Sequence, residues 1–181
     1  MKKAMQKVVS GNQGFTLVEL IIVIIILGIL AALAIPQFTT STQDAKESTL
    51  KADLAVLRNA VNLYFHEHSS TYPGAVKEDG TGTATGAGDN PDAFVNQMTQ
   101  FTDKSGKVSA TKDALFPYGP YLTTMPDNPL AHANVAAAAL ATTSVTSDLG
   151  AITADGTPTV GWKYSKETGW IICNNATYAG W

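Results

Sequence analysis

The sequence predicts an α+β protein with a long N-terminal helical spine and a small C-terminal head. Three features predict it: an apolar block over residues 15–35, a helical stripe of apolar side chains after it, and two aromatic, β-branched runs near the C-terminus. We expect a basic leader at 1–14, a hydrophobic transmembrane helix at 15–36 and an amphipathic helix at 37–68. Residues 69–181 are expected to form a globular head with variable loops and a β-hairpin or antiparallel sheet.

The length and the net charge of the chain limit its number of domains and its possible partners. The 181 residues allow about one domain. Charged residues make up 15% of the chain, and the formal net charge is −3. A weakly acidic chain lacks the basic surface that nucleic-acid binding requires, so we expect no nucleic-acid partner.

The apolar block is long enough to cross a membrane. Between Phe15 and Ile35 only Thr16 and Glu19 are polar. As a helix, this stretch would be about 30 Å long, which is the thickness of a bilayer core. Three basic residues stand before it: Lys2, Lys3 and Lys7. By the positive-inside rule they place the N-terminus in the cytoplasm and the head across the membrane.

Two simple explanations of the block remain open on these grounds. It can be a plain membrane anchor, or a secretory signal removed after the small-residue triplet Ala32-Leu33-Ala34. The apolar run is longer than the ~7–15 residues of a signal core. It also holds a carboxylate at Glu19, which is costly in hydrocarbon unless it is paired.

The residues around Glu19 favour a third explanation. The stretch Gly14-Phe15-Thr16-Leu17-Val18-Glu19-Leu20 resembles the class III signal of type IV pilins and type II secretion pseudopilins. The resemblance implies that a prepilin peptidase removes leader 1–14 between Gly14 and Phe15. It also implies that Phe15 is then N-methylated, and that Glu19 is the fifth residue of the mature chain.

Glu19 then gains a role in assembly. The cut leaves an α-amino cation on Phe15, and the Glu19 carboxylate one helical turn away can meet the amine of a neighbouring subunit. An unpaired charge in an apolar core is strongly unfavourable, so we expect this pairing to set the axial register between subunits. The alternative is that Glu19 only reaches the lipid headgroups from the helix end.

Two further positions, Gly28 and Pro36, match the family's pattern. Gly28 lies in mid-helix, where it costs about 1 kcal/mol against alanine. Gly28 and Ala32 form a small-x-x-x-small pair that lets helices approach closely. Pro36 removes a helical hydrogen bond, so we expect a kink and an interruption there. The resemblance implies that the span from Gly28 to Pro36 can loosen in a filament.

The second half of the spine needs a cover. Its apolar side chains recur at spacings of four and three: Leu50, Leu54, Leu57, Val61 and Tyr64. This pattern predicts a helix to about Phe65 with one face buried by the head. His66-Glu67-His68 is expected to be its frayed, solvated end.

The middle of the head offers weaker signals. Residues 92–102 are predicted to form a short helix with Phe94 and Met98 on one side. Three prolines predict irregular structure over residues 118–130, a segment that resembles one of major pseudopilins. Residues 131–157 are expected to be a variable surface region with one short helix at Val135–Leu140.

The C-terminal end predicts a hairpin. The runs Val160–Tyr164 and Trp170–Cys173 flank a five-residue loop that contains glycine. We expect Trp162 or Tyr164 to pack on Leu54 and Leu57. Cys173 is the one cysteine, which excludes an intramolecular disulfide, and it is expected to be a buried strand residue.

No catalytic constellation stands out, so we expect no enzyme and no cofactor. Major pseudopilins bind calcium in a C-terminal loop, which the resemblance raises for this chain. The acidic pattern of that loop is not clearly present here. Asp148 and Asp155 are weak candidates only, and we expect no metal.

The expected function is that of a structural filament subunit. The proline segment and the absent disulfide favour a type II secretion pseudopilus that drives protein export. The alternatives are a major or minor pilin of a surface pilus for adhesion or motility, and a membrane-tethered ligand-binding or enzymatic head. Implied partners are further copies of the chain, the prepilin peptidase, an inner-membrane assembly platform, minor pilins or pseudopilins, and the membrane. Before assembly the head is expected in the periplasm, and afterwards in a periplasmic pseudopilus or a cell-surface pilus.

Overall fold

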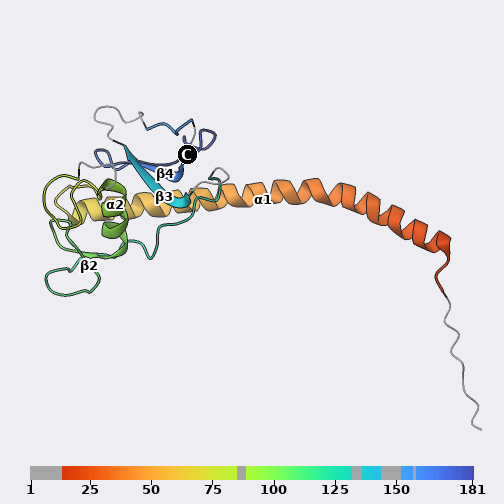
Figure 1. The fold of residues 1–181 in the computed structure, drawn as a ribbon, viewed down its shortest axis with the longest axis horizontal. Coiled ribbons are helices and arrows are strands. Elements are labelled where there is room, and N and C mark those ends of the chain that lie inside the picture. Colours follow the sequence, from red (N-terminus) through yellow and green to blue (C-terminus); the bar gives the residue numbers. More distant parts are fainter. Residues whose placement is uncertain (1–13, 85–88, 132–135, 144–151, 157) are drawn as a thin grey trace, which may run out of the picture. The chain divides into compact units, whose positions relative to one another are not determined.

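The computed structural model describes residues 14–84, 89–131, 136–143, 152–156 and 158–181 (Figure 1). The chain divides into two compact units, Met1–Gln43 and Asp44–Trp181. The first contains the N-terminal part of helix α1 (Leu17–Glu67), and the second contains the rest of α1 and the head. An α+β fold with a long apolar N-terminal helix is therefore confirmed.

Helix α1 continues through Pro36 without a break. The interruption expected there is therefore absent from the helical backbone. Proline removes a backbone donor from the helix. Next to it, the hydroxyl groups of Thr39 and Thr40 donate hydrogen bonds to the Pro36 carbonyl oxygen, at 2.8 and 3.0 Å. Serine and threonine often bond back to a preceding carbonyl in this way within helices.

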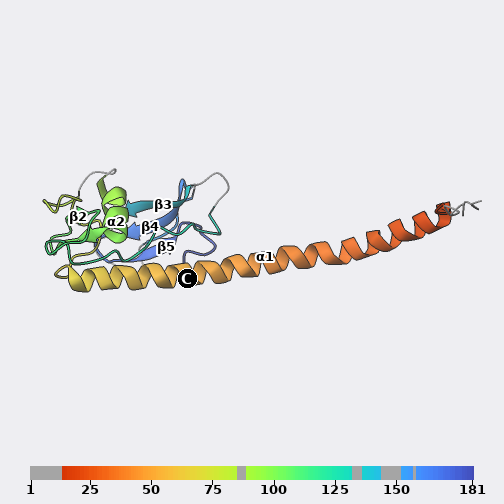
Figure 2. The ribbon, with the colours of Figure 1, turned by 90° about the horizontal axis from the view of Figure 1, so that it is seen from below.

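The predicted stripe along the second half of α1 is confirmed. Its five side chains are at most 2% exposed: Leu50, Leu54, Leu57, Val61 and Tyr64. They form the base of the hydrophobic core of the head. Figure 2 shows the sheet and helix α2 (Asp89–Thr99) on the same side of this part of α1.

A three-stranded sheet covers the stripe, in the order β3 (Ala136–Thr143), β4 (Val160–Ser165) and β5 (Ile171–Cys173). Strands β4 and β5 are antiparallel, with Trp162 opposite Cys173 and Tyr164 opposite Ile171. The predicted hairpin is thus confirmed. Strand β3 pairs with β4 in parallel, which makes the sheet mixed rather than purely antiparallel.

The short helix expected at Val135–Leu140 is wrong. Val135 lies outside the described residues, and the residues that follow form β3. Alanine favours a helix in isolation. Here these residues form a strand because they pair with β4, and strand preference depends strongly on neighbouring strands.

The predicted helix at residues 92–102 exists, but it lies earlier in the chain, as α2 (Asp89–Thr99). Phe94 and Met98 are fully buried as expected. The following residues turn into β1 (Phe101–Thr102), which pairs antiparallel with β2 (Val108–Ser109). Residues 118–130 contain no helix or strand, which confirms the irregular segment.

The aromatic side chains of β4 complete the core. Trp162 and Tyr164 are fully buried in the same cluster as Leu54 and Leu57, as predicted. The Trp162 indole N–H donates to the Pro126 carbonyl at 2.8 Å, so the irregular segment also holds the sheet in place. Cys173 is buried in β5, which confirms its predicted position.

The end of α1 is packed, so the prediction of a frayed, solvated terminus is wrong for His68. This side chain is 2% exposed. Its Nδ1 lies 2.9 Å from the Tyr64 carbonyl oxygen, and its Nε2 lies 2.9 Å from the Thr102 hydroxyl group. Its ring stacks on Tyr64 with 3.7 Å between the centroids.

Candidate processing and assembly site

The predicted cleavage position precedes the helix. Gly14, Phe15 and Thr16 are exposed and non-helical, and α1 begins at Leu17. The Phe15 side chain is 84% exposed, and within the described residues no atom beyond the adjoining ones lies within 4 Å of the position that a Cβ on Gly14 would take. Backbone that is exposed and outside regular structure is where proteolysis is favoured. The Gly14–Phe15 bond meets that condition.

Glu19 closes a capping box at the start of α1. Its Oε2 atom accepts hydrogen bonds from the Thr16 backbone N–H at 2.9 Å and from the Thr16 hydroxyl group at 2.7 Å. In return, the Glu19 N–H donates to the Thr16 hydroxyl oxygen at 3.2 Å. These reciprocal bonds satisfy donors that the first turn of a helix leaves without partners.

Sequence analysis missed this role of Thr16, although the signal was present. Thr16 and Glu19 stand in the Thr-x-x-Glu spacing that defines a capping box before an apolar run. The negative charge also lies at the positive end of the helix dipole. Glu19 is therefore already hydrogen-bonded within a single chain. The Thr16–Glu19 pair lies after the predicted cut, so cleavage would leave it in the mature chain.

The rest of the first unit exposes apolar side chains on all sides. Among the large ones from Phe15 to Phe38, exposure ranges from 42% at Ile21 to 84% at Phe15. By length and composition, α1 is the one helix in the described chain that is able to cross a membrane. Such a surface is stable only in lipid or against other apolar surfaces.

The predicted packing positions lie on this open surface. In the described part of the chain, no heavy atom outside the helix lies within 4 Å of a Cβ placed on Gly28. Ala32, one turn later, is exposed as well. Small residues four apart let a second helix approach closely, so the pair is available for helix packing. Pro36 is also exposed, within the continuous helix.

Asp155, a weak calcium candidate, is bound within the chain. Its Oδ1 forms an ion pair with Lys163 Nζ at 2.6 Å, and its Oδ2 accepts a hydrogen bond from Asn174 Nδ2 at 3.0 Å. These bonds, from Lys163 first, lower the pKa of Asp155. Lys163 Nζ also donates to the Thr153 carbonyl at 2.8 Å, so an internal cation already occupies these oxygens. Asp148 lies outside the described residues.

Within the described ranges, no group of three or more His, Cys, Asp or Glu side chains is arranged to hold a metal ion. The residues present around Asp155 do not fit a calcium site as they stand. Ca²⁺ takes six to eight oxygen ligands. Here the nearest counter-charge is the ammonium group of Lys163.

Comparison with known proteins gives a family model at the N-terminus and relatives that match part of the chain. The family model described as the prokaryotic N-terminal methylation motif matches residues 9–35. The chain is 48% identical to the type IV major pilin protein PilA of Myxococcus xanthus over 56 residues, which is 31% of this chain and 26% of that protein. It is 42% identical to the type II secretion system core protein G of Pseudomonas aeruginosa over 53 residues, or 29% of this chain and 37% of that protein.

A longer match extends into the head. The chain is 33% identical to the type IV major alpha-pilin of Moraxella bovis over 111 residues, which is 56% of this chain and 69% of that protein. The chain covers only about a quarter to two fifths of the length of the other two relatives. No solved structure matches the chain.

Proposed function

Because the chain belongs to the family of type IV pilins and type II secretion pseudopilins, we propose that it is a filament subunit of a type II secretion pseudopilus. The observation that carries the proposal is the N-terminal apolar part of α1. It begins at a methylation motif, and it exposes large apolar side chains on every side. Such a helix can rest in a bilayer as a monomer and pack against copies of itself in a filament.

In the proposed pathway, the subunit is processed and anchored in the membrane before it is assembled. The prepilin peptidase cuts between Gly14 and Phe15 on the cytoplasmic side, and Phe15 is methylated. The apolar part of α1 spans the inner membrane, with the head in the periplasm. An inner-membrane assembly platform and minor subunits then add the chain to a filament, where Gly28 and Ala32 allow close helix packing.

Glu19 then fixes the axial register. Within one chain, Thr16 bonds to Oε2 of Glu19, so Oε1 is the oxygen that a neighbour's Phe15 amine would bind. The capping box lowers the penalty of an isolated Glu19, since its carboxylate already accepts two hydrogen bonds. The charge stays in apolar surroundings all the same, so arrangements that bring a cation to it are favoured over those that do not.

Two observations favour the pseudopilus. The chain matches a type II secretion core protein G, and its single cysteine cannot close the C-terminal disulfide loop that is usual in surface pilins. The second candidate is a pilin of a surface pilus. It is favoured by the Moraxella bovis match, which covers 56% of the chain, against 29% for the match to protein G.

Deleting the gene distinguishes the pseudopilus from the surface pilus. For a pseudopilin, exported enzymes should accumulate in the periplasm while surface fibres are unchanged. The opposite result, normal export with loss of surface fibres seen by electron microscopy, would replace the pseudopilus with the surface pilus.

Processing is tested on the same chain. N-terminal mass spectrometry should find methylated Phe15 in the wild type, whereas Gly14→Asp should leave the precursor uncut in the inner membrane. Gly11→Asp changes another leader glycine and serves as the matched control, which should be cut normally. A mature start at Ile35 would revive the ordinary secretory signal.

A further inference from the structure

The C-terminal half of α1 has two uncovered flanks, one on each side of the buried stripe. Leu57 is fully buried against the head. Successive helical residues are about 100° apart, so Val56 and Arg58 project to opposite sides of Leu57. Leu63 lies seven positions after Val56 and shares its side, and Asn62 lies four positions after Arg58 and shares the other.

The first of these, the aliphatic flank, consists of Asp53, Val56, Leu63 and Glu67. Val56 is 53% exposed and Leu63 is 52% exposed. An acidic residue stands at each end of this apolar pair. Burial raises the pKa of Asp53.

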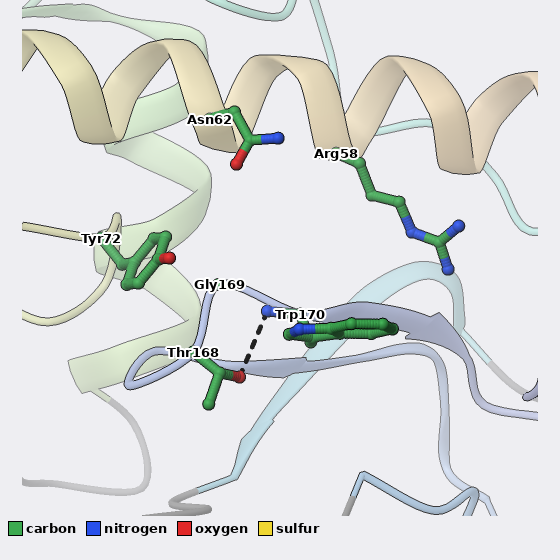
Figure 3. Close-up of a pocket in the computed structure, with 6 residues that line it drawn as sticks. All are labelled: Arg58, Asn62, Tyr72, Thr168, Gly169 and Trp170. Atoms are coloured by element: carbon green, nitrogen blue, oxygen red, sulfur yellow. Dashed lines mark hydrogen bonds between the residues drawn. The ribbon is translucent and has the colours of Figure 1, made fainter. Parts of the chain in front are cut away.

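The opposite side forms the aromatic groove, a cavity of about 390 Å³ lined by Arg58, Asn62, Tyr72, Thr168, Gly169 and Trp170. Figure 3 shows the Trp170 indole across the cavity from Arg58 and Asn62, with Tyr72 at one end. Trp170 is 45% exposed, whereas the other two tryptophans are more deeply buried.

Gly169, in the turn between β4 and β5, lets the turn approach Tyr72 at one end of the groove. Gly169 has a φ of +73°, a conformation that side chains rarely adopt. A Cβ at Gly169 would lie 2.2 Å from the Tyr72 ring, so only glycine lets the turn and the ring meet.

The groove is also cationic. Arg58 Nη2 donates to the Ile171 carbonyl at 3.3 Å and to the Trp181 carbonyl, which fixes the guanidinium group. Both bonds use one nitrogen, and a guanidinium group carries five N–H donors, so others remain for a carboxylate. Lys51, seven positions earlier on the same side, lies 4.3 Å above the Trp181 ring.

We infer that the aromatic groove of one subunit receives the aliphatic flank of a second copy of the chain. Leu63 and Val56 pack on the Trp170 indole, and the acidic ends of the flank face Lys51 and Arg58. The inference rests on the proposed filament function and identifies a contact between heads.

Three arguments support a second copy as the occupant. The charges are complementary, since the flank carries Asp53 and Glu67, whereas Arg58 lines the groove and Lys51 lies on the same side of α1. The groove combines Trp, Tyr and Arg, the side chains that dominate binding energy at protein interfaces. The two surfaces differ and lie on one molecule, which is the arrangement that builds open helical filaments instead of closed dimers.

The test uses full-length chains assembled in cells. Asn59→Cys places a thiol beside Val56 and Leu63, and Thr168→Cys places one in the groove, so that Leu63, Arg58 and Trp170 stay in place. When the two variants are produced together with different tags, a short bismaleimide should link them into a mixed dimer within filaments. The control pair, Asn59→Cys with Leu115→Cys, uses another exposed loop position and should give no such dimer.

Alanine variants provide a second test of the proposed contact. Leu63→Ala and Trp170→Ala should each reduce the amount of filament about tenfold or more, as expected for central contact residues. Leu115→Ala, which removes an apolar side chain that is 74% exposed, should leave filaments unchanged. Filaments that form normally with both alanine variants, or a link through Leu115→Cys alone, would overturn the inference and leave the filament function intact. Absence of filaments from the unsubstituted chain would overturn both.

Discussion

His68 shows how a polar residue is held inside the head. Nδ1 lies against a carbonyl oxygen and must donate, and in the neutral imidazole Nε2 then accepts from the Thr102 hydroxyl group. Burial lowers the pKa of His68, against smaller raising effects of Tyr64, Glu67 and Asp103. The rings of Tyr118 and Tyr121 also face it.

This arrangement predicts that acid destabilises the head. Because the folded state favours neutral His68, the unfolded chain binds more protons, and the stabilisation is complete only above the ordinary histidine pKa of about 6.5. It is lost progressively as the pH falls below that value. Thermal unfolding of the full-length chain in detergent should therefore show a midpoint that decreases from pH 7 to pH 5.

The variants His68→Gln and His66→Gln separate this effect from others. The first should flatten the dependence on pH between 5 and 7, whereas the second changes an exposed histidine and should preserve it. An unchanged slope in His68→Gln would mean that other groups control the acid sensitivity.

At the scale of single residues, the sequence predicts which residues are functional better than it predicts which distant residues they contact. The positions of Gly14, Phe15 and Glu19 follow from a local motif. The capping hydrogen bonds between Thr16 and Glu19 were equally predictable from the sequence, since they join residues three positions apart. The burial of His68 was not, because Thr102 and Tyr118 reach it from distant parts of the chain.

At the scale of elements, α1 joins the head through its buried stripe. Leu57→Ala should lower the free energy of unfolding of the head by about 2–5 kcal/mol, since Leu57 is fully buried and its loss leaves a cavity. Val56→Ala, at the neighbouring exposed position, should change it by no more than about 0.5 kcal/mol. Chemical unfolding of the full-length variants in detergent, followed by tryptophan fluorescence, measures both values. Equal losses from the two variants would show that the stripe is misassigned.

Elements with a strong local period were predictable, and those made by distant pairing were not. The spacing of Leu50, Leu54 and Leu57 identifies a helical face, and the runs around Gly169 identify the β4–β5 hairpin. Strand β3 has no such signal, because its alanine-rich residues become a strand only beside β4. The aromatic groove likewise joins α1 to a loop more than 100 residues later, a contact that no local pattern encodes.

At the scale of the whole molecule, the two units call for different surroundings. The second unit buries its apolar side chains, as Leu57 and Trp162 show, whereas the N-terminal part of α1 leaves its own exposed. A uniformly apolar helix can pack against its copies at many axial offsets. A filament needs one offset, and Glu19 is the one charged residue between Phe15 and Ile35 that can select it.

The most direct test of this account is electron microscopy of filaments from the Glu19→Ala chain, with immunoblots of the membrane fraction. We expect the Glu19→Ala subunit to be processed and inserted with a folded head, but filaments to be absent or disordered. Asp44→Ala removes an exposed carboxylate outside the apolar block and should give normal filaments. Normal filaments from Glu19→Ala would contradict the claim that this carboxylate sets the register between subunits.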